Sequence, residues 1–234
     1  MEVRGLENLR AALAGGKGAI LCSAHFGSPK SCFSLIGALG YPITIVARWS
    51  FTASGAEGSI SRLQYALDHN IPLTSHLRRP NIERMPGSID TAVQAAIVLR
   101  QNEVVGIMID DEVEPGDRSR PVPLDFLNGK ALLVPGATTI AQLTGAPVLV
   151  MLMRRSVDWR HQVLEIFPPI PIEGDPVIAF RRCLALVEDA IKRYPAQWKK
   201  LKLSHLVEMG LISHEVASSR PWRTFHSEDA VRQR

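Results

Sequence analysis

The 234-residue chain has no uninterrupted apolar run that approaches the roughly 18 residues needed to cross a membrane. Its start, Met1 followed by Glu2-Val3-Arg4, lacks the charged and then apolar pattern of a secretory signal peptide. The three cysteines fit neither a metal-ligand spacing nor an even-numbered disulfide framework. We therefore expect a cytoplasmic protein whose cysteines stay reduced.

Several motifs that carry a known chemistry are also missing. The sequence has no Walker phosphate-binding loop, no GxGxxG dinucleotide motif and no GxSxG nucleophile elbow. The histidines form no HxxH or HExxH pattern and share no metal-ligand spacing. A covalent serine mechanism has no support here, and we expect an activity without a metal or an organic cofactor.

The charge is distributed unevenly along a chain of ordinary globular composition. Hydrophobic residues make up 46% and charged residues 21%, and the net charge is +4. We expect one domain over residues 1–205 and a polar, partly disordered tail over 206–234. Residues 181–234 hold 11 Lys and Arg against 6 Asp and Glu. Within them, 198–203 mixes lysines with apolar residues, which is typical of either a solvated helix end or a weak membrane-surface contact.

Apolar periodicity alternates between the period of strands and the period of helices. The expected strands are 19–24, 41–47, 71–74, 104–109, 148–153 and 162–167. The expected helices are 6–13, 31–39, 59–69, 88–100, 135–143 and 176–193, with Ser88 as an N-cap. This alternation predicts an α/β fold with a mostly parallel central sheet flanked by helices.

His25 directly follows the apolar run 19–24, which is typical of a strand buried on both faces. The carboxyl ends of parallel strands are where open α/β sheets bind their ligands. Histidine is also the side chain best suited to transfer a proton near neutral pH. We take His25 as a candidate general base, the alternative being an ordinary polar residue at a strand end.

Asp110 and Asp111 follow the next strongly buried strand in the same way. All three polar side chains should therefore lie at one edge of the sheet. A carboxylate there can orient the imidazole of His25, and the alternative is that the pair caps a helix or solvates a loop.

Seven short segments in a fixed order give the sequence its strongest signal. They are 5–9 (GLENL), 16–18 (GKG), 23–27 (SAHFG), 105–111 (VGIMIDD), 124–129 (LDFLNG), 141–148 (AQLTGAPV) and 194–198 (YPAQW). Together they resemble the catalytic domain of the bacterial lipid A late acyltransferases, part of the lysophospholipid acyltransferase superfamily, which also includes mycobacterial phosphatidylinositol mannoside acyltransferases. The resemblance covers about residues 3–203.

The resemblance implies a glycerolipid acyltransferase-like fold in which His25 acts as the general base. It also implies a thioester donor, acyl-CoA or acyl carrier protein, and a glycolipid or small-molecule acceptor. The family has an acidic residue five positions after its histidine, but this chain has Lys30 there. A lysine cannot accept the imidazole N–H, so we expect Asp110 or Asp111 to take that role. Family members usually carry an apolar anchor helix before this domain, and the chain starts where that helix would end. We therefore expect at most a weak peripheral contact with the inner membrane surface.

The resemblance and the spacing also suggest substrate-binding residues. Arg62 matches, in approximate spacing, an arginine that the family keeps after its second strand. Arg154 follows a strand and Arg84 precedes a helix N-terminus, so each is placed to bind a phosphate group, the alternative for all three arginines being an ordinary surface residue. Phe126 and Asn128 lie in an aromatic-Gly loop, which is expected either to line an acyl-chain groove or to form a hairpin turn over the sheet edge.

Two further functions remain open on the sequence alone. The basic C-terminal part is compatible with a transferase on the same scaffold that uses an aminoacyl-tRNA donor, so tRNA is a second candidate partner. Lys30 is compatible with a non-catalytic binding protein in which the site has decayed.

Overall fold

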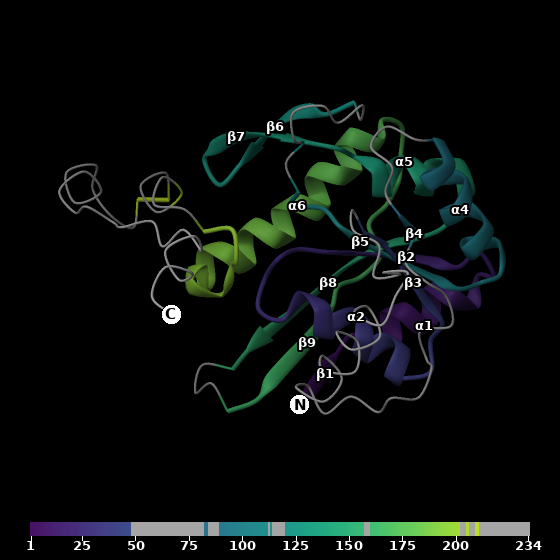
Figure 1. Ribbon diagram of the computed structural model, residues 1–234, viewed down its shortest axis with the longest axis horizontal. Helices are drawn as coiled ribbons and strands as arrows, with labels where there is room; N and C mark the ends of the chain where they lie inside the picture. Colours follow the sequence, from purple (N-terminus) through teal and green to yellow (C-terminus); the bar gives the residue numbers. More distant parts are fainter. Residues whose placement is uncertain are drawn as a thin grey trace, which may run out of the picture.

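A seven-stranded sheet with helices on both faces forms the centre of the computed structural model (Figure 1). The structure describes residues 1–47, 82–83, 89–111, 113, 120–156, 160–201, 205 and 209–210. The strand order is β1-β9-β8-β2-β5-β3-β4. The strands are β1 (Glu2–Arg4), β2 (Ala19–Ser23), β3 (Ile43–Ala47), β4 (Ile82–Glu83), β5 (Val104–Met108), β8 (Val148–Arg155) and β9 (Gln162–Ile166).

Five neighbouring strands, β8, β2, β5, β3 and β4, run in the same direction. Strand β9 pairs antiparallel with β8, and β1 pairs parallel with β9, so these two strands run the opposite way. All five residues of β2 are buried, as expected for a strand covered on both faces. The predicted α/β fold with a mostly parallel sheet is therefore confirmed.

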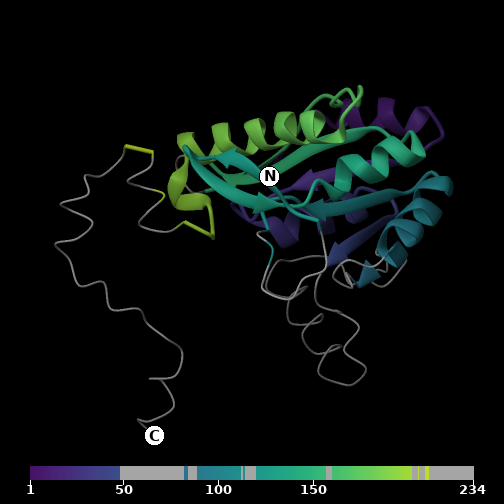
Figure 2. The ribbon, with the colours of Figure 1, turned by 90° about the horizontal axis from the view of Figure 1, so that it is seen from above.

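The helices divide between the two faces of the sheet. They are α1 (Leu6–Ala14), α2 (Pro29–Ala38), α4 (Ile89–Arg100), α5 (Gly136–Thr144), α6 (Pro176–Arg193) and the 3₁₀ helix η1 (Pro195–Gln197). Helices α1 and α2 pack on one face through residues such as Leu9 and Phe33. Helices α4, α5 and α6 pack on the other face through residues such as Leu99 and Phe180. Figure 2 shows the long α6 lying along the sheet.

The ends of two helices follow from their sequence. The Asp175 side chain accepts the Val177 N–H at 2.9 Å, and Pro176 occupies the first turn, so α6 begins where the sequence predicts. Gly145 ends α5 with φ +72°, a left-handed conformation that glycine adopts without strain.

A hairpin of β6 (Val122–Phe126) and β7 (Gly129–Leu133) packs beside α6. Its turn residues, Leu127 and Asn128, have φ values of +53° and +66°. The Leu127 N–H donates to the carboxylate of Glu188 on α6, which fixes the turn against the helix. The loop is therefore a hairpin turn, and its lining of an acyl-chain groove stays a prediction.

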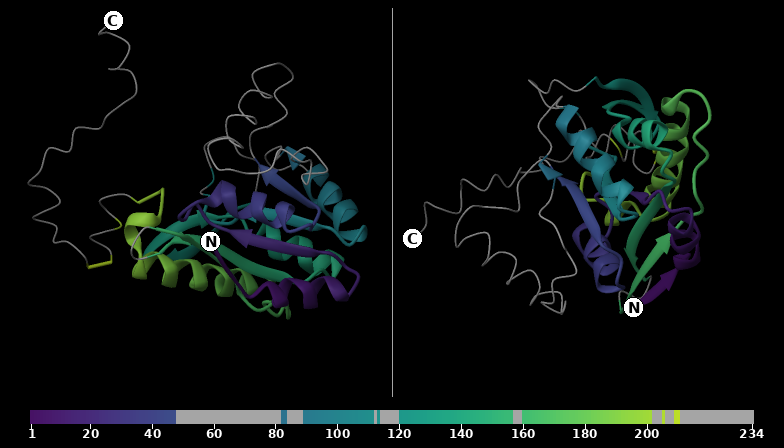
Figure 3. Two further views of the ribbon diagram at one scale, coloured as in Figure 1. Left: turned by 90° about the horizontal axis from the view of Figure 1, so that it is seen from below. Right: turned by 90° about the vertical axis from the view of Figure 1, so that its right-hand side faces the viewer.

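The structure also differs from the sequence-based expectations at its edges. Strand β1 was not expected, and it lies beside β9 at the edge that carries the N-terminus (Figure 3). The expected helix 59–69, the strand 71–74 and the N-cap Ser88 lie outside the described residues. Since only 209–210 are described beyond residue 205, the division into a domain and a tail stays a prediction. None of the described helices is long and apolar enough to cross a membrane.

Candidate active site

The register of two parallel strands brings His25 beside Asp110. Strand β2 pairs with β5 so that Ser23 lies opposite Met108, and the Ile109 N–H continues the ladder by donating to the Ser23 carbonyl at 2.9 Å. Two residues further along each strand, His25 therefore faces Asp110. The carboxyl ends of the central strands meet here, as the sequence predicts.

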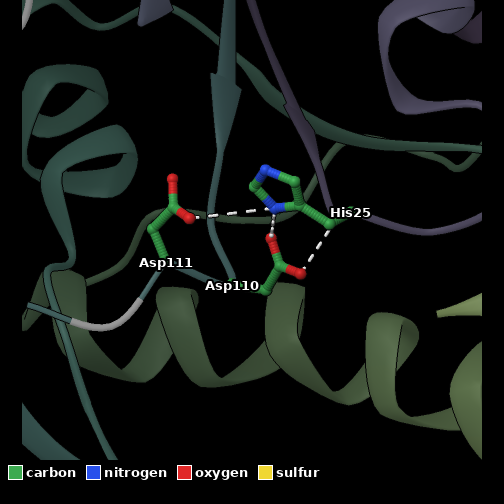
Figure 4. A group of neighbouring side chains, drawn as sticks. All are labelled: His25, Asp110 and Asp111. Carbon is green, nitrogen blue, oxygen red and sulfur yellow. Dashed lines mark hydrogen bonds and ion pairs between the residues drawn. The ribbon is translucent and has the colours of Figure 1, made fainter. Parts of the chain in front are cut away.

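Asp110 binds His25 through both of its carboxylate oxygens. Oδ1 lies 2.9 Å from the imidazole Nδ1, and Oδ2 accepts the His25 backbone N–H at 2.9 Å (Figure 4). An ionised carboxylate can only accept, so the proton on this nitrogen belongs to the ring and Nδ1 is the donor. Nε2 then carries the free lone pair, and it lies on the side of the ring away from Asp110 (Figure 4). The side chain of His25 is 31% exposed, so the imidazole can be reached from solvent.

Asp110 is fully buried yet remains an acceptor. Its side chain has no exposed surface. Burial acts to raise its pKa, but the hydrogen bond and charge of His25, the charge of Lys200 and the hydrogen bond from Trp198 outweigh burial. The net result holds the pKa of Asp110 below its usual value. The carboxylate is therefore ionised at neutral pH and favours the Nδ1–H tautomer of His25.

Asp111 lies in a second position around the same imidazole. Its Oδ1 is 3.8 Å from His25 Nδ1, beyond hydrogen-bond distance, and it forms an ion pair with the Lys200 ammonium. Asp110 therefore accepts the hydrogen bond from the imidazole of His25, whereas Asp111 adds only its negative charge. Sequence reasoning could not rank the two.

The same three side chains meet the spacing that a metal ion needs, since His25, Asp110 and Asp111 offer ligand atoms within 4.8 Å of one another. Both oxygens of Asp110 already accept N–H groups, and the Lys200 ammonium occupies the position next to Asp111 that a cation would take. This donor set suits an acid–base group, and we assign none of the three as a metal ligand.

Trp198 and Lys200 are the site residues that sequence reasoning missed. The buried indole Nε1–H of Trp198 donates to Asp110 Oδ2 at 2.9 Å, and Lys200 Nζ donates to the Asp110 main-chain oxygen at 2.9 Å. The signal was present, because Trp198 ends the motif YPAQW and a buried tryptophan needs an acceptor for its N–H. The stretch 198–203 was instead interpreted as a solvated helix end or a membrane contact.

The predicted substrate-binding residues are only partly placed around this group. Phe126 is buried and contacts the Trp198 ring edge-on, with ring centroids 5.8 Å apart, so it supports the site from behind. Asn128 lies in the hairpin turn. The Arg154 guanidinium stacks over the Tyr194 ring at 5.2 Å. Arg62 and Arg84 lie outside the described residues.

Gly27 lets the chain turn sharply after His25. It has φ +58° and forms a parallel bridge with Met153 of β8. A Cβ atom at this position would lie 1.9 Å from the Met153 carbonyl oxygen. The close approach of β8 therefore requires glycine here, two residues after the imidazole.

We expect Gly27→Ala to destabilise the fold much more than Gly16→Ala. Gly16 has a similar φ of +72° with nothing within 4 Å of its would-be Cβ, so it carries only the left-handed strain of about 1–2 kcal/mol. The contact with Met153 adds an overpacking cost of about 1–3 kcal/mol for Gly27→Ala. Urea unfolding of both variants measures the difference, and equal losses would show that β8 moves aside without cost.

The fold and the site define an α/β protein with a carboxylate-bound histidine at the carboxyl edge of a mostly parallel sheet. Residues 74–203, more than half of the chain, match the sequence model of the bacterial lipid A biosynthesis acyltransferases, and the chain belongs to this family. The predicted resemblance is confirmed, and membership implies acyl transfer as the general activity. The matched span contains Asp110, Asp111, Trp198 and Lys200 but begins after His25. A search of curated proteins gave no match.

Proposed function

We propose that this protein transfers an acyl group from an activated thioester directly to a hydroxyl or amine, with His25 as the general base. The observation that carries the proposal is the 2.9 Å contact between His25 Nδ1 and the ionised Asp110. It leaves Nε2 as the basic nitrogen, on a side chain that solvent can reach. The acidic residue that the family has at the position of Lys30 is not needed, because Asp110 takes over its role from the end of β5.

In the proposed reaction Nε2 removes the acceptor proton as the acceptor oxygen or nitrogen attacks the thioester carbonyl. The carbon–sulfur bond breaks when the tetrahedral intermediate collapses, and the imidazolium returns its proton to the departing thiolate. The negative charge of Asp110 stabilises the imidazolium for as long as the negatively charged tetrahedral intermediate exists. No acyl-enzyme forms.

The donor and the acceptor belong to the proposal. Family membership supports acyl-CoA or an acyl carrier protein as donor and a glycolipid as acceptor, with a small soluble molecule as the alternative acceptor. Lys200 and Arg193, two of the cations that suggested a tRNA partner, are paired with Asp111 and Asp189. No contact within the described residues favours the aminoacyl-tRNA alternative.

A thiol-release assay tests this function. The protein is incubated with acyl-CoA or acyl carrier protein thioesters and with candidate acceptors, and released thiol is followed with a chromogenic thiol reagent. Cys22, Cys32 and Cys183 are all buried, so the protein itself contributes little background. We expect thiol release that depends on the acceptor, while the intact mass of the protein stays unchanged.

Two outcomes would contradict the proposal in different ways. A protein mass increased by one acyl group would indicate a covalent intermediate. Binding of a thioester without release from any donor would support the non-catalytic alternative.

Membrane contact through the described part of the stretch 198–203 should be weak and sensitive to salt. Within the stretch 198–203, Trp198 is buried and Lys200 is paired with Asp111, which leaves Lys199 as its exposed described cation. One cation near anionic lipid contributes about 1 kcal/mol, and this attraction fades with ionic strength. Cosedimentation with anionic liposomes should be lost at moderate salt, and binding that resists salt would restore a firmly membrane-bound role.

A further inference from the structure

Residues 197–199 pair with the backbone of residues 25–27. The Lys199 N–H donates to the His25 carbonyl at 2.8 Å, and the Gly27 N–H donates to the Gln197 carbonyl at 2.7 Å. Phe26 and Trp198 form an antiparallel bridge between these bonds. An isolated β-bridge thus joins the 197–200 segment to residues 25–27, and the side chains of Trp198 and Lys200 reach Asp110 and Asp111 from this segment.

Trp198 fixes the orientation of the Asp110 carboxylate. Its indole N–H donates to Oδ2, the same oxygen that accepts the His25 backbone N–H. Two donors on Oδ2 leave Oδ1 directed at the imidazole Nδ1. Trp198 is 5% exposed and its indole contacts the rings of Phe126 and His205, so it has little freedom to move.

Lys200 acts on the charge around the same imidazole. The charged groups that the structure records in contact with His25 are Asp110 and Asp111, both from the end of β5, and Lys200 contacts both of these residues. A second unpaired carboxylate 3.8 Å from Nδ1 would favour the protonated imidazole. A protonated imidazole cannot accept a proton from the acceptor.

We propose that Trp198 and Lys200 are positioning residues of the acid–base group: Trp198 orients Asp110, and Lys200 pairs with Asp111 and offsets its negative charge beside the imidazole of His25. This inference rests on the proposed function, because it assigns both residues to the acid–base group of that reaction. It also gives Asp111 a defined part, as the anchor that holds Lys200 and the 197–200 segment on the site.

The test compares two neighbouring lysines, of which only Lys200 contacts Asp110 and Asp111 through its ammonium group. Lys200→Gln and Lys199→Gln remove the same charge from adjacent positions, but Lys199 is exposed and joins the site through its backbone alone. The imidazole C2–H resonance of His25, assigned by its loss in His25→Asn, is titrated by NMR in both variants. Lys200→Gln should move the midpoint to higher pH, because it leaves the negative charge of Asp111 uncompensated, while Lys199→Gln should leave the midpoint in place and Lys200→Arg should restore it.

The pH–rate profile of kcat/KM supplies the second measurement. Its acidic limb should move to higher pH in Lys200→Gln by the same amount as the titration midpoint, and it should stay in place in Lys199→Gln. Trp198→Phe, which keeps a ring but loses the N–H, should lower kcat about tenfold with little change in KM.

The two measurements separate this inference from the proposed function. Equal titration midpoints in Lys200→Gln and Lys199→Gln would overturn the role of Lys200 whatever the activity. A raised midpoint together with no transfer in the wild type would support charge compensation and contradict the acyltransfer mechanism. An unchanged kcat in a folded Trp198→Phe protein would overturn the role of Trp198.

Discussion

His25→Ala is expected to fold like the wild type and to lose at least about 10²-fold in acyl transfer rate. The imidazole is a partly exposed side chain at a strand end, so its removal leaves no large internal cavity. Its loss deprives the acceptor of the group that takes its proton, and a positioned general base contributes typically 10²–10⁴-fold. The measurement is kcat/KM in the thiol-release assay, alongside thermal unfolding to confirm the fold.

The control for this variant is the uncatalysed reaction of the same thioester and acceptor. A folded His25→Ala protein with wild-type kcat/KM would show that the base is another group. An unfolded variant would show that the hydrogen bonds to Asp110 serve mainly the structure. In that case the transfer rate of a folded His25→Gln protein, which retains a polar side chain, decides whether His25 is the base or serves only the structure.

Asp110→Asn is expected to reduce the transfer rate by a similar or larger factor, roughly 10²–10⁴-fold. The side chain keeps its shape, but only one of its two acceptor atoms remains for three N–H donors. If the oxygen of the new amide accepts from Trp198 and from the His25 backbone, the NH₂ group of the same amide must face Nδ1 of His25. The imidazole then holds its proton on Nε2 and cannot act as a base there.

Lys30→Ala is the matched control, because Lys30 occupies the position where the family has its acidic residue. We expect Lys30→Ala to change kcat/KM far less than Asp110→Asn, and Asp111→Asn to fall between them. A larger loss in Lys30→Ala than in Asp110→Asn would show that Asp110 has not taken over the orienting role.

Low pH should reduce the free energy of unfolding through the carboxylate of Asp110. The pKa of Asp110 is lower in the folded protein than its usual value, despite burial, because of His25, Lys200 and Trp198. Its contribution to stability is therefore complete above the usual carboxyl pKa of about 4 and is lost as the pH falls through the lower folded value. Asp110→Asn should accordingly reduce the acid dependence of the free energy of unfolding.

Much of the site could be predicted because it depends on strand ends. The apolar runs before His25 and before Asp110 indicate parallel strands, and parallel strands bring their carboxyl ends to one edge. The register between β2 and β5 could not be predicted, and that register decides that Asp110, and not Asp111, binds Nδ1. Nothing local in the sequence distinguishes two consecutive aspartates.

The motif YPAQW marks Trp198, but the contacts that Trp198 and Lys200 make with Asp110 and Asp111 could not be predicted, for a different physical reason. Lysines near apolar residues at the end of a helix suit a surface, and only a long-range pairing with residues 25–27 turns them toward the sheet. The short strand β1 was missed for the same reason, since three residues carry no periodicity and their pairing with β9 lies far along the chain.

This pairing has a consequence for the newly made protein. Ribosomes deliver the chain from its N-terminus, so His25 emerges early, Asp110 midway and Trp198 near the end of the described chain. The sheet strands on which His25 and Asp110 sit can associate before the 197–200 segment exists. The nascent protein therefore carries its base without the residues that orient and neutralise the carboxylates, and the complete group forms only when synthesis has passed Lys200.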